Sequence, residues 1–224
     1  PQLVFDDADL EAALPFLENA GVQNAGQTCS ASSRILVQRG VYDEVVALMT
    51  ERYGKLRVGP AIDDLEVGPL ISAKQKRMVE GYLAVLAPET IAARGVIVEG
   101  APAGGHYVAP TLAVGLGPDH RLAREEIFGP VQAVIPFETE EDAIAIANGT
   151  DYGLVASIWT RDGARQMRLA RKLAAGPVFI NNYGAGGGVE LPVGGGGKSG
   201  HGREKGFGAL YGFSTLKTVA ALHG

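Results

Sequence analysis

One cysteine stands where a thiol could do chemistry. Cys29 ends the run Asn24-Ala-Gly-Gln-Thr-Cys29, between a helical pattern and a strand pattern. Such a junction leaves backbone N–H groups without partners, and these groups stabilise a thiolate or a developing oxyanion. Gly26 lets the chain turn tightly just before the thiol. The opposing interpretation is a small buried core residue, the commonest fate of a free cysteine, and position alone favours it.

Two adjacent carboxylates precede a strand pattern. Glu125 and Glu126 lie in the run Arg124-Glu-Glu-Ile-Phe-Gly-Pro130. Open α/β sheets bind ligands beside strand ends, so a carboxylate here could hold the two hydroxyls of a ribose. A solvated charge pair in a surface loop explains the same residues, and from the residues alone this simpler interpretation is favoured.

The late glycine-rich segment, residues 184–208, carries no phosphate-binding signature. It contains Gly-Lys-Ser at 197–199, but Pro192 stands where a P-loop needs glycine, and no strand or apolar helix flanks it. The spacing from Gly200 to Gly206 misses the dinucleotide fingerprint by one residue. The four histidines show no metal-ligand spacing, and one cysteine excludes a zinc site with two thiolates. We predict no metal site.

Alternating helix and strand patterns must position these residues. Helices are expected over 10–17, where Pro15 should cause a kink or a late start, over 41–49, and from a capping box formed by Ser72 and Gln75. Thr139 and Asp162 should cap two more. Strands are expected over 34–38, 96–99, 107–114, 131–137, 154–160 and 178–181. Two consecutive strand–helix–strand units predict an α/β fold with parallel strands and helices on the sheet faces.

Composition narrows the function classes. The chain has 224 residues, with 20 Lys plus Arg against 25 Asp plus Glu, and this acidic balance argues against a nucleic-acid or anionic-membrane partner. No run of 18 apolar residues exists, and no basic leader precedes an apolar stretch, so we expect neither a membrane span nor a signal peptide. The single cysteine points to a reducing compartment, which makes a cytoplasmic location the expectation.

Four stretches in this order resemble the aldehyde dehydrogenase superfamily over essentially the whole chain. They are residues 24–29 followed by Ser-Arg at 33–34, Glu-Glu-Ile-Phe-Gly-Pro at 125–130, Ile-Asn-Asn-Tyr-Gly at 180–184, and 198–204 running on to Lys-Thr-Val at 217–219. The resemblance reverses both preferences above. It implies that Cys29 is the nucleophile, that Glu126 binds the nicotinamide ribose of NAD or NADP, and that Phe128 packs near the ring.

The resemblance also implies a reaction. An aldehyde would become a carboxylic acid through a thiohemiacetal and a thioester on Cys29, with Glu204 relaying protons for the deacylating water. Asn181, Tyr183 and Val193 would line the aldehyde entrance. Val193 replaces an aromatic residue and Gly196 a tyrosine found in many relatives, so we expect a roomier entrance.

The resemblance implies a parallel-sheet, three-layer, Rossmann-like catalytic domain over 1–213 and an oligomerisation strand over 214–224. The edge-strand composition of 214–221 fits this strand, and a homo-oligomer is expected. In the family, the cofactor-binding domain and the general base lie upstream of a segment like residues 1–9, so residues 1–224 alone should have little dehydrogenase activity. Two alternatives stay open: a non-catalytic assembly module, and an enzyme that hands the thioester to coenzyme A.

Overall fold

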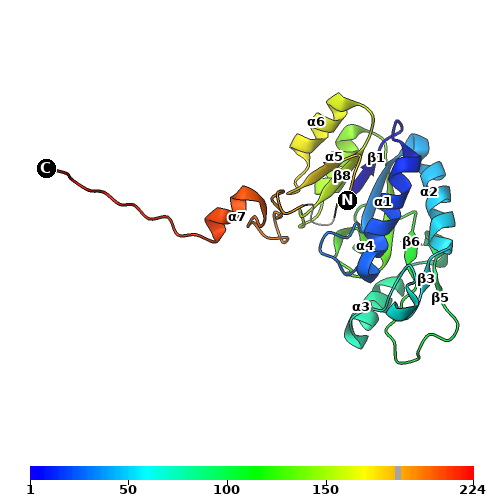
Figure 1. Cartoon of the computed structure of the whole chain (residues 1–224). Helices are drawn as coiled ribbons and strands as arrows, with labels where there is room; N and C mark the ends of the chain where they lie inside the picture. The colour runs from blue at the N-terminus through cyan, green and yellow to red at the C-terminus, as the bar shows by residue number, and fades with distance from the viewer. Residues whose placement is uncertain (185–187) are drawn as a thin grey trace.

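The computed structural model describes residues 1–184 and 188–224, and a seven-stranded sheet forms its centre (Figure 1). The strands lie in the order β4-β6-β7-β2-β1-β8-β9, and all neighbours are parallel except β4 and β6. Their bounds are β1 Gln2–Val4, β2 Arg34–Gln38, β4 Ile91–Arg94, β6 Thr111–Ala113, β7 Val131–Phe137, β8 Ala156–Trp159 and β9 Val178–Ile180. A separate parallel pair joins β3 (Arg57–Val58) to β5 (Val96–Ile97). The predicted α/β class is confirmed.

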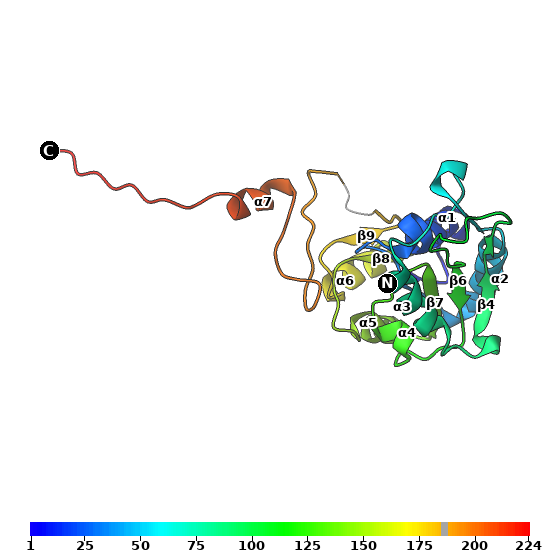
Figure 2. The same ribbon diagram turned by 90° about the horizontal axis from the view of Figure 1, so that it is seen from below.

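The central strands are apolar because helices cover the sheet on both sides. Strands β1 and β8 are buried along their whole length, and β2 and β7 are buried at all but one position each. Parallel sheets with both faces covered need such continuous apolar runs. Helices α1 (Leu10–Val22) and α2 (Arg39–Gly54) lie on one face, and α5 (Glu140–Asn148) and α6 (Gly163–Lys172) lie on the other (Figure 2). This division follows from right-handed crossovers running in opposite directions along the sheet.

Helix caps agree with the sequence, with two exceptions. Thr139 forms a capping box with Asp142 at the start of α5, and Asp162 caps α6. Helix α1 begins at Leu10, capped by Asp9, so the late start expected at Pro15 is wrong. The helix continues through the proline because Leu14 and Leu17 are buried on its inner face.

The second exception concerns α3 (Ala73–Leu83). Ser72 caps this helix, but the Gln75 side chain does not return a bond to complete the predicted capping box. Its amide instead bonds the carbonyl groups of Ile127 and Phe128 in another loop. The short α4 (Arg121–Arg124) follows, and three 3₁₀ turns complete the described helices of the main body: η1 Gln23–Gly26, η2 Ala61–Asp63 and η3 Pro88–Thr90.

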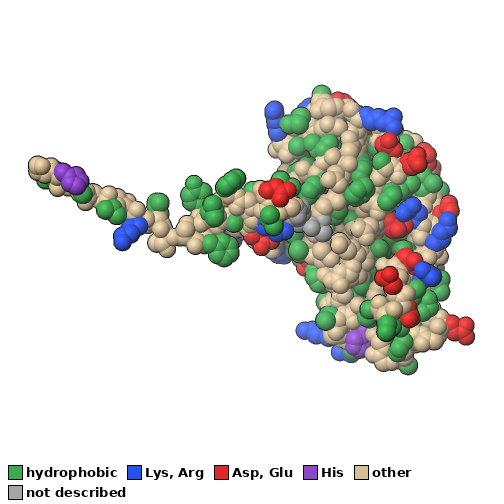
Figure 3. Space-filling view, in the orientation of Figure 1, with side chains coloured by type: hydrophobic (Ala, Val, Ile, Leu, Met, Phe, Trp, Pro, Cys, Tyr) green, Lys and Arg blue, Asp and Glu red, His purple; other side chains and the backbone are tan. Residues whose placement is uncertain are grey.

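The C-terminal segment extends away from the main body (Figure 1). Helix α7 (Gly206–Gly212) begins the extension, and residues 213–224 follow without forming a strand in this chain's own sheet. Large apolar side chains stand exposed along it (Figure 3). They are Phe207, Leu210, Tyr211, Phe213, Leu216, Val219 and Leu222. Pairing of this tail with a second subunit remains a prediction.

Candidate active site

A cleft opens at the amino ends of the parallel strands. The loops that lead into β2, β7, β8 and β9 line it, and they carry Cys29, Glu126 and Phe128; Tyr183, which follows β9, lines it as well. Open α/β sheets usually bind ligands at the opposite edge, beside the carboxyl ends of the strands. The cysteine motif and the paired-carboxylate motif both line this cleft, although about 100 residues separate them along the chain.

Cys29 is exposed in this cleft, so the interpretation of a buried core cysteine is wrong. Residues 28–31 form a β-turn, closed by a 2.8 Å bond from the Ala31 N–H to the Thr28 carbonyl oxygen, and Cys29 takes its second position. Within the described part of the chain, the Cys29 N–H has no hydrogen-bond acceptor. An N–H group beside the sulfur is thus free to donate to an oxygen that develops negative charge there.

The residues before the turn adopt an unusual backbone. Asn24 and Ala25 have φ angles of 53° and 54°, in the left-handed region that non-glycine residues rarely occupy. Two side-chain bonds hold this bend: the Asn24 amide donates to the Gln27 carbonyl at 3.0 Å, and the Gln27 amide donates to the Asn24 carbonyl at 3.1 Å. The Gln27 side-chain oxygen also accepts from the Ile71 N–H at 2.9 Å. These contacts fix the path of the chain into the β-turn.

Glycine lets the two motifs touch backbone to backbone. A Cβ atom on Gly26 would lie 2.1 Å from the Gly129 carbonyl oxygen, and Gly26 also has a φ of 72°. A Cβ on Gly129 would lie 2.4 Å from a Val79 methyl group. Real Cβ atoms do not approach other atoms so closely. Both glycines are therefore required by packing, and their contact sets the distance between the nucleophile turn and the carboxylate loop.

The two adjacent carboxylates have different surroundings. Tyr82 donates its hydroxyl to Glu125 at 2.8 Å and Arg121 donates its Nε at 2.9 Å, and both bonds lower the pKa of that carboxyl. Glu126 is exposed in the cleft and has no partner among residues 1–184 and 188–224. The free carboxylate is therefore the one available to bind hydroxyl groups of a ligand.

Phe128 is held in a left-handed conformation, with a φ of 54° and 36% of the residue exposed. A non-glycine residue keeps such a conformation only where neighbours enforce it, at about 1–3 kcal/mol. Gln75 contributes here: its Nε2 donates to the Phe128 carbonyl at 2.8 Å and to the Ile127 carbonyl at 3.3 Å. This role of Gln75 was not predicted from the sequence, because the helix-capping pattern explained the residue without it.

A buried arginine lines the cleft. Arg34 donates to the carbonyl groups of Ile146 and Ala147, at 2.8 Å and 3.0 Å. These carbonyls belong to the last turn of α5, whose negative dipole end faces the cleft, so the guanidinium offsets that charge. Burial, with a smaller effect from Arg124, lowers the pKa of Arg34 to about 10. It stays charged at neutral pH.

Two of the residues expected at the aldehyde entrance, Tyr183 and Asn181, lie in different places. Tyr183 lines the cleft, and its hydroxyl donates to the Ser30 carbonyl oxygen beside Cys29. Asn181 does not line it: its side chain accepts from the Thr160 N–H and donates to the Thr160 carbonyl, both at 3.0 Å, beyond the carboxyl end of β8. Asn181 therefore joins two strand ends, and the structure does not bring it to Cys29.

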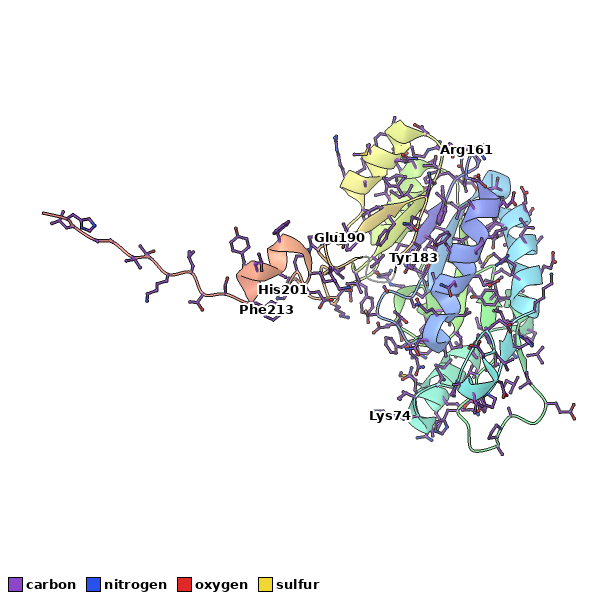
Figure 4. All side chains as sticks on the ribbon, viewed as in Figure 1. Lys74, Arg161, Tyr183, Glu190, His201 and Phe213 are labelled. Atoms are coloured by element: carbon purple, nitrogen blue, oxygen red, sulfur yellow. The ribbon has the colours of Figure 1, made fainter. Side chains whose placement is uncertain are left out.

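Val193 and Glu204 lie outside the cleft. They pair with each other through two 2.8 Å backbone bonds, and the Glu204 side chain is exposed without a partner among the described residues. Glu190 and His201 come from the same projecting segment, whereas Tyr183 faces the main body (Figure 4). The structure thus brings Cys29, Glu126, Phe128 and Tyr183 together and leaves Asn181, Val193 and Glu204 apart.

The contacts of Lys198 and Ser199 explain why residues 197–199 do not form a P-loop. Lys198 forms a 2.7 Å ion pair with Asp151, and the Ser199 hydroxyl accepts from the Gly153 N–H at 3.2 Å. Both side chains that would hold a phosphate are thus used to attach the glycine-rich segment to the turn before β8. In the described ranges, no cluster of three His, Cys, Asp or Glu side chains could hold a metal ion. No helix there is long and apolar enough to cross a membrane.

Comparison with known proteins agrees with the geometry. A family model described as the aldehyde dehydrogenase family matches residues 1–219. The chain is 41% identical over 223 residues to a betaine aldehyde dehydrogenase of Cereibacter sphaeroides, covering 98% of this chain and 45% of that protein. It resembles the solved structure of a candidate aldehyde dehydrogenase from Burkholderia cenocepacia, with a TM-score of 0.97 and 61% identity over 100% of this chain and 48% of the other.

A second solved structure is a betaine aldehyde dehydrogenase of Staphylococcus aureus in complex with NAD+. Its TM-score is 0.89 at 38% identity, and the match covers 95% of this chain and 43% of that one. The chain therefore spans about half the length of the proteins it matches.

Proposed function

Because this chain belongs to the aldehyde dehydrogenase family, we propose that it supplies the nucleophile and part of the nicotinamide site of an NAD(P)-dependent enzyme that oxidises an aldehyde to a carboxylic acid. The observation that carries the proposal is the position of Cys29: an exposed thiol on a β-turn whose adjacent N–H has no acceptor among the described residues, in the cleft that also holds Glu126 and Phe128. The Staphylococcus aureus relative binds NAD+, which supports the same cofactor here.

The chemistry of Cys29 begins with its thiolate. The sulfur attacks the carbonyl carbon of the aldehyde, a C–S bond forms, and the carbonyl electron pair moves onto the oxygen. The Cys29 N–H, free in the described structure, donates to this oxyanion. Oxidation of the adduct by two electrons leaves a thioester on Cys29. Water then adds to the thioester carbon, the C–S bond breaks, and the carboxylic acid leaves, while one proton of the water passes to solvent and the thiolate returns.

The residues in the cleft fit a nicotinamide cofactor. The Glu126 carboxylate has no partner among the described residues and can accept two hydroxyl groups of a ribose, and the partly exposed Phe128 ring offers an apolar surface. When bound, the cofactor supplies the electron-pair acceptor for the oxidation. The loop geometry enforced by Gln75 and Gly129 would hold Glu126 and Phe128 ready for it.

The proton relay expected of Glu204 lacks support from its position, since the side chain is exposed outside the cleft. It stays a prediction, as does the roomier entrance inferred from Val193 and Gly196. Hydrolysis is proposed over transfer to coenzyme A only on the sequence resemblance. A cytoplasmic location likewise stays a prediction.

The exposed C-terminal tail supports a second role for the chain, in assembly. Leu216, Val219 and Leu222 are 94%, 81% and 101% exposed, and a row of apolar side chains in water marks an interaction surface. We propose that the tail docks on a second copy of the chain, in addition to the catalytic role. This role does not compete with the first, because the tail and the cleft use different residues.

The catalytic proposal is tested by Cys29→Ser in the full-length protein. Aldehyde-dependent NADH formation should fall by a factor on the order of 10³ or more, because the nucleophile is lost. NAD+ affinity and the unfolding midpoint should stay at wild-type values, since the Cys29 thiol makes no hydrogen bond to residues 1–184 or 188–224. Betaine aldehyde and a neutral aliphatic aldehyde are the substrates to compare. Wild-type turnover by the variant would refute the proposal.

A further inference from the structure

We propose that Tyr183 is a positioning residue for the nucleophile: its hydroxyl holds the Ser30 carbonyl and thereby fixes the turn that presents Cys29. The proposal rests on the function proposed for Cys29. It differs from the expectation that Tyr183 forms a wall of the aldehyde entrance, because the hydroxyl of a wall residue would be available to the substrate. Here that hydroxyl is already bonded to the protein.

The tyrosine is anchored to the sheet. The chain leaves β9 and reverses at Asn181, and the Ser157 hydroxyl on β8 donates to the Asn182 carbonyl at 3.0 Å. The Tyr183 N–H donates to the Asn182 side chain at 2.8 Å, and its ring packs against Phe179 of β9 with 6.2 Å between centroids. Two strands therefore define where the phenol lies.

The turn that it reaches has few supports of its own. One backbone bond, from Ala31 to Thr28, closes the β-turn around Cys29 and Ser30. The nearest other bonds lie at or beyond its ends: the Thr28 hydroxyl donates to the Gln23 carbonyl at 3.5 Å, and the Ser32 N–H donates to the Ala20 carbonyl at 2.9 Å. Within the described residues, the Tyr183 hydroxyl is the donor that the Ser30 carbonyl receives. Removing it leaves the central part of the turn tied at one point.

The surroundings of the phenol argue for positioning and against proton transfer. Burial raises the pKa of Tyr183, and negative charge on Cys29 raises it further, so the phenol stays protonated at neutral pH. Its proton is directed at a carbonyl oxygen and not at sulfur. Tyr183 therefore acts on Cys29 through the backbone.

The test is Tyr183→Phe in the full-length protein, with Tyr42→Phe as the matched control. Tyr42 also donates its hydroxyl to a backbone carbonyl, that of Val134 at 3.4 Å, but it lies on α2 away from the cleft. Hydrogen exchange should be about three- to tenfold faster at the Ala31 amide in Tyr183→Phe, as expected for the loss of one neutral hydrogen bond, and unchanged in Tyr42→Phe. Unchanged exchange at Ala31 would overturn the proposal, whatever the enzyme does.

Kinetics give the second measurement. Tyr183→Phe should lower kcat for the aldehyde about three- to tenfold and leave the KM for the cofactor unchanged, because the lost bond acts on the turn alone. The pH midpoint of Cys29 alkylation by iodoacetamide should not move, and a shift would make Tyr183 a proton partner and overturn positioning. If Tyr183→Phe does not fold, Ser157→Ala decides: it removes the anchor of Asn182 and should also speed exchange at Ala31. Exchange at the wild-type rate in that variant would refute the idea.

These measurements distinguish a failure of the catalytic proposal for Cys29 from a failure of the positioning proposal for Tyr183. A Cys29→Ser enzyme with full turnover refutes the catalytic role, while the exchange data at Ala31 still test whether Tyr183 orders the turn. Faster exchange without any loss of kcat overturns the catalytic significance of the bond and leaves the nucleophile proposal intact.

Discussion

The contact between Gly26 and Gly129 makes a sharp prediction about stability. Replacing Gly26 with alanine places a Cβ 2.1 Å from the Gly129 carbonyl oxygen, 2.2 Å from its carbonyl carbon and 2.7 Å from the Pro130 nitrogen. All three neighbours are backbone atoms just before β7, so no side-chain rotation can relieve the overlap. The backbone of one motif must move away from the other.

The expected magnitude follows from two contributions. An L-residue at a φ of 72° costs about 1–2 kcal/mol, and forcing extra atoms into a packed site costs about 1–3 kcal/mol. Gly26→Ala should therefore lower the free energy of unfolding by about 2–5 kcal/mol. Urea denaturation followed by circular dichroism measures this value, and Cys29 alkylation in the native state reports whether the turn has shifted.

Gly81→Ala is the matched control. Gly81 lies within α3 and a Cβ there meets no atom within 4 Å, so this variant should be stabilised by about 0.4–1 kcal/mol through helix propensity and a less flexible unfolded chain. A Gly26→Ala protein as stable as wild type would mean that the two motifs are not in backbone contact, and the shared cleft would lose its basis. If Gly26→Ala yields no folded protein while Gly81→Ala does, the loss exceeds the range above and the contact stands.

Two further predictions concern the cofactor loop and the tail. Glu126→Gln should weaken NAD+ binding roughly tenfold, because charge-assisted hydrogen bonds become neutral ones. Glu125→Gln should leave the NAD+ affinity unchanged, since Glu125 is already bonded to Tyr82 and Arg121. Calorimetric titration measures both affinities, and equal losses in the two variants would contradict the assignment of Glu126. Deleting residues 214–224 should lower the oligomeric mass measured by light scattering without changing the circular dichroism spectrum, because these residues are exposed and extend away from the main body (Figure 1). An unchanged mass would exclude the tail as the docking segment.

Several elements of the fold could be predicted from local sequence patterns. The apolar runs of β2 and β7 and the caps Thr139 and Asp162 were predictable because strand burial and helix capping depend on neighbours within a few residues. The motifs around Cys29 and Glu126 were also visible in the sequence. Their meaning, however, came from resemblance, since composition and spacing alone favoured a core cysteine and a surface charge pair.

Long-range contacts bring the residues of the cleft together, and these contacts could not be read from the sequence. Gln75 and Arg34 bond carbonyl groups that are 52 to 113 positions away along the chain, and no local pattern encodes such partners. Tyr183 and Asn181 stand two residues apart in one motif, yet one reaches Ser30 and the other bonds Thr160. The chain reverses direction between them, at the left-handed Asn181, and this reversal depends on the packing of β8 and β9. Sequence spacing fixes the distance between two residues only where the backbone is regular. The residues that line the cleft could therefore be identified only in the folded chain.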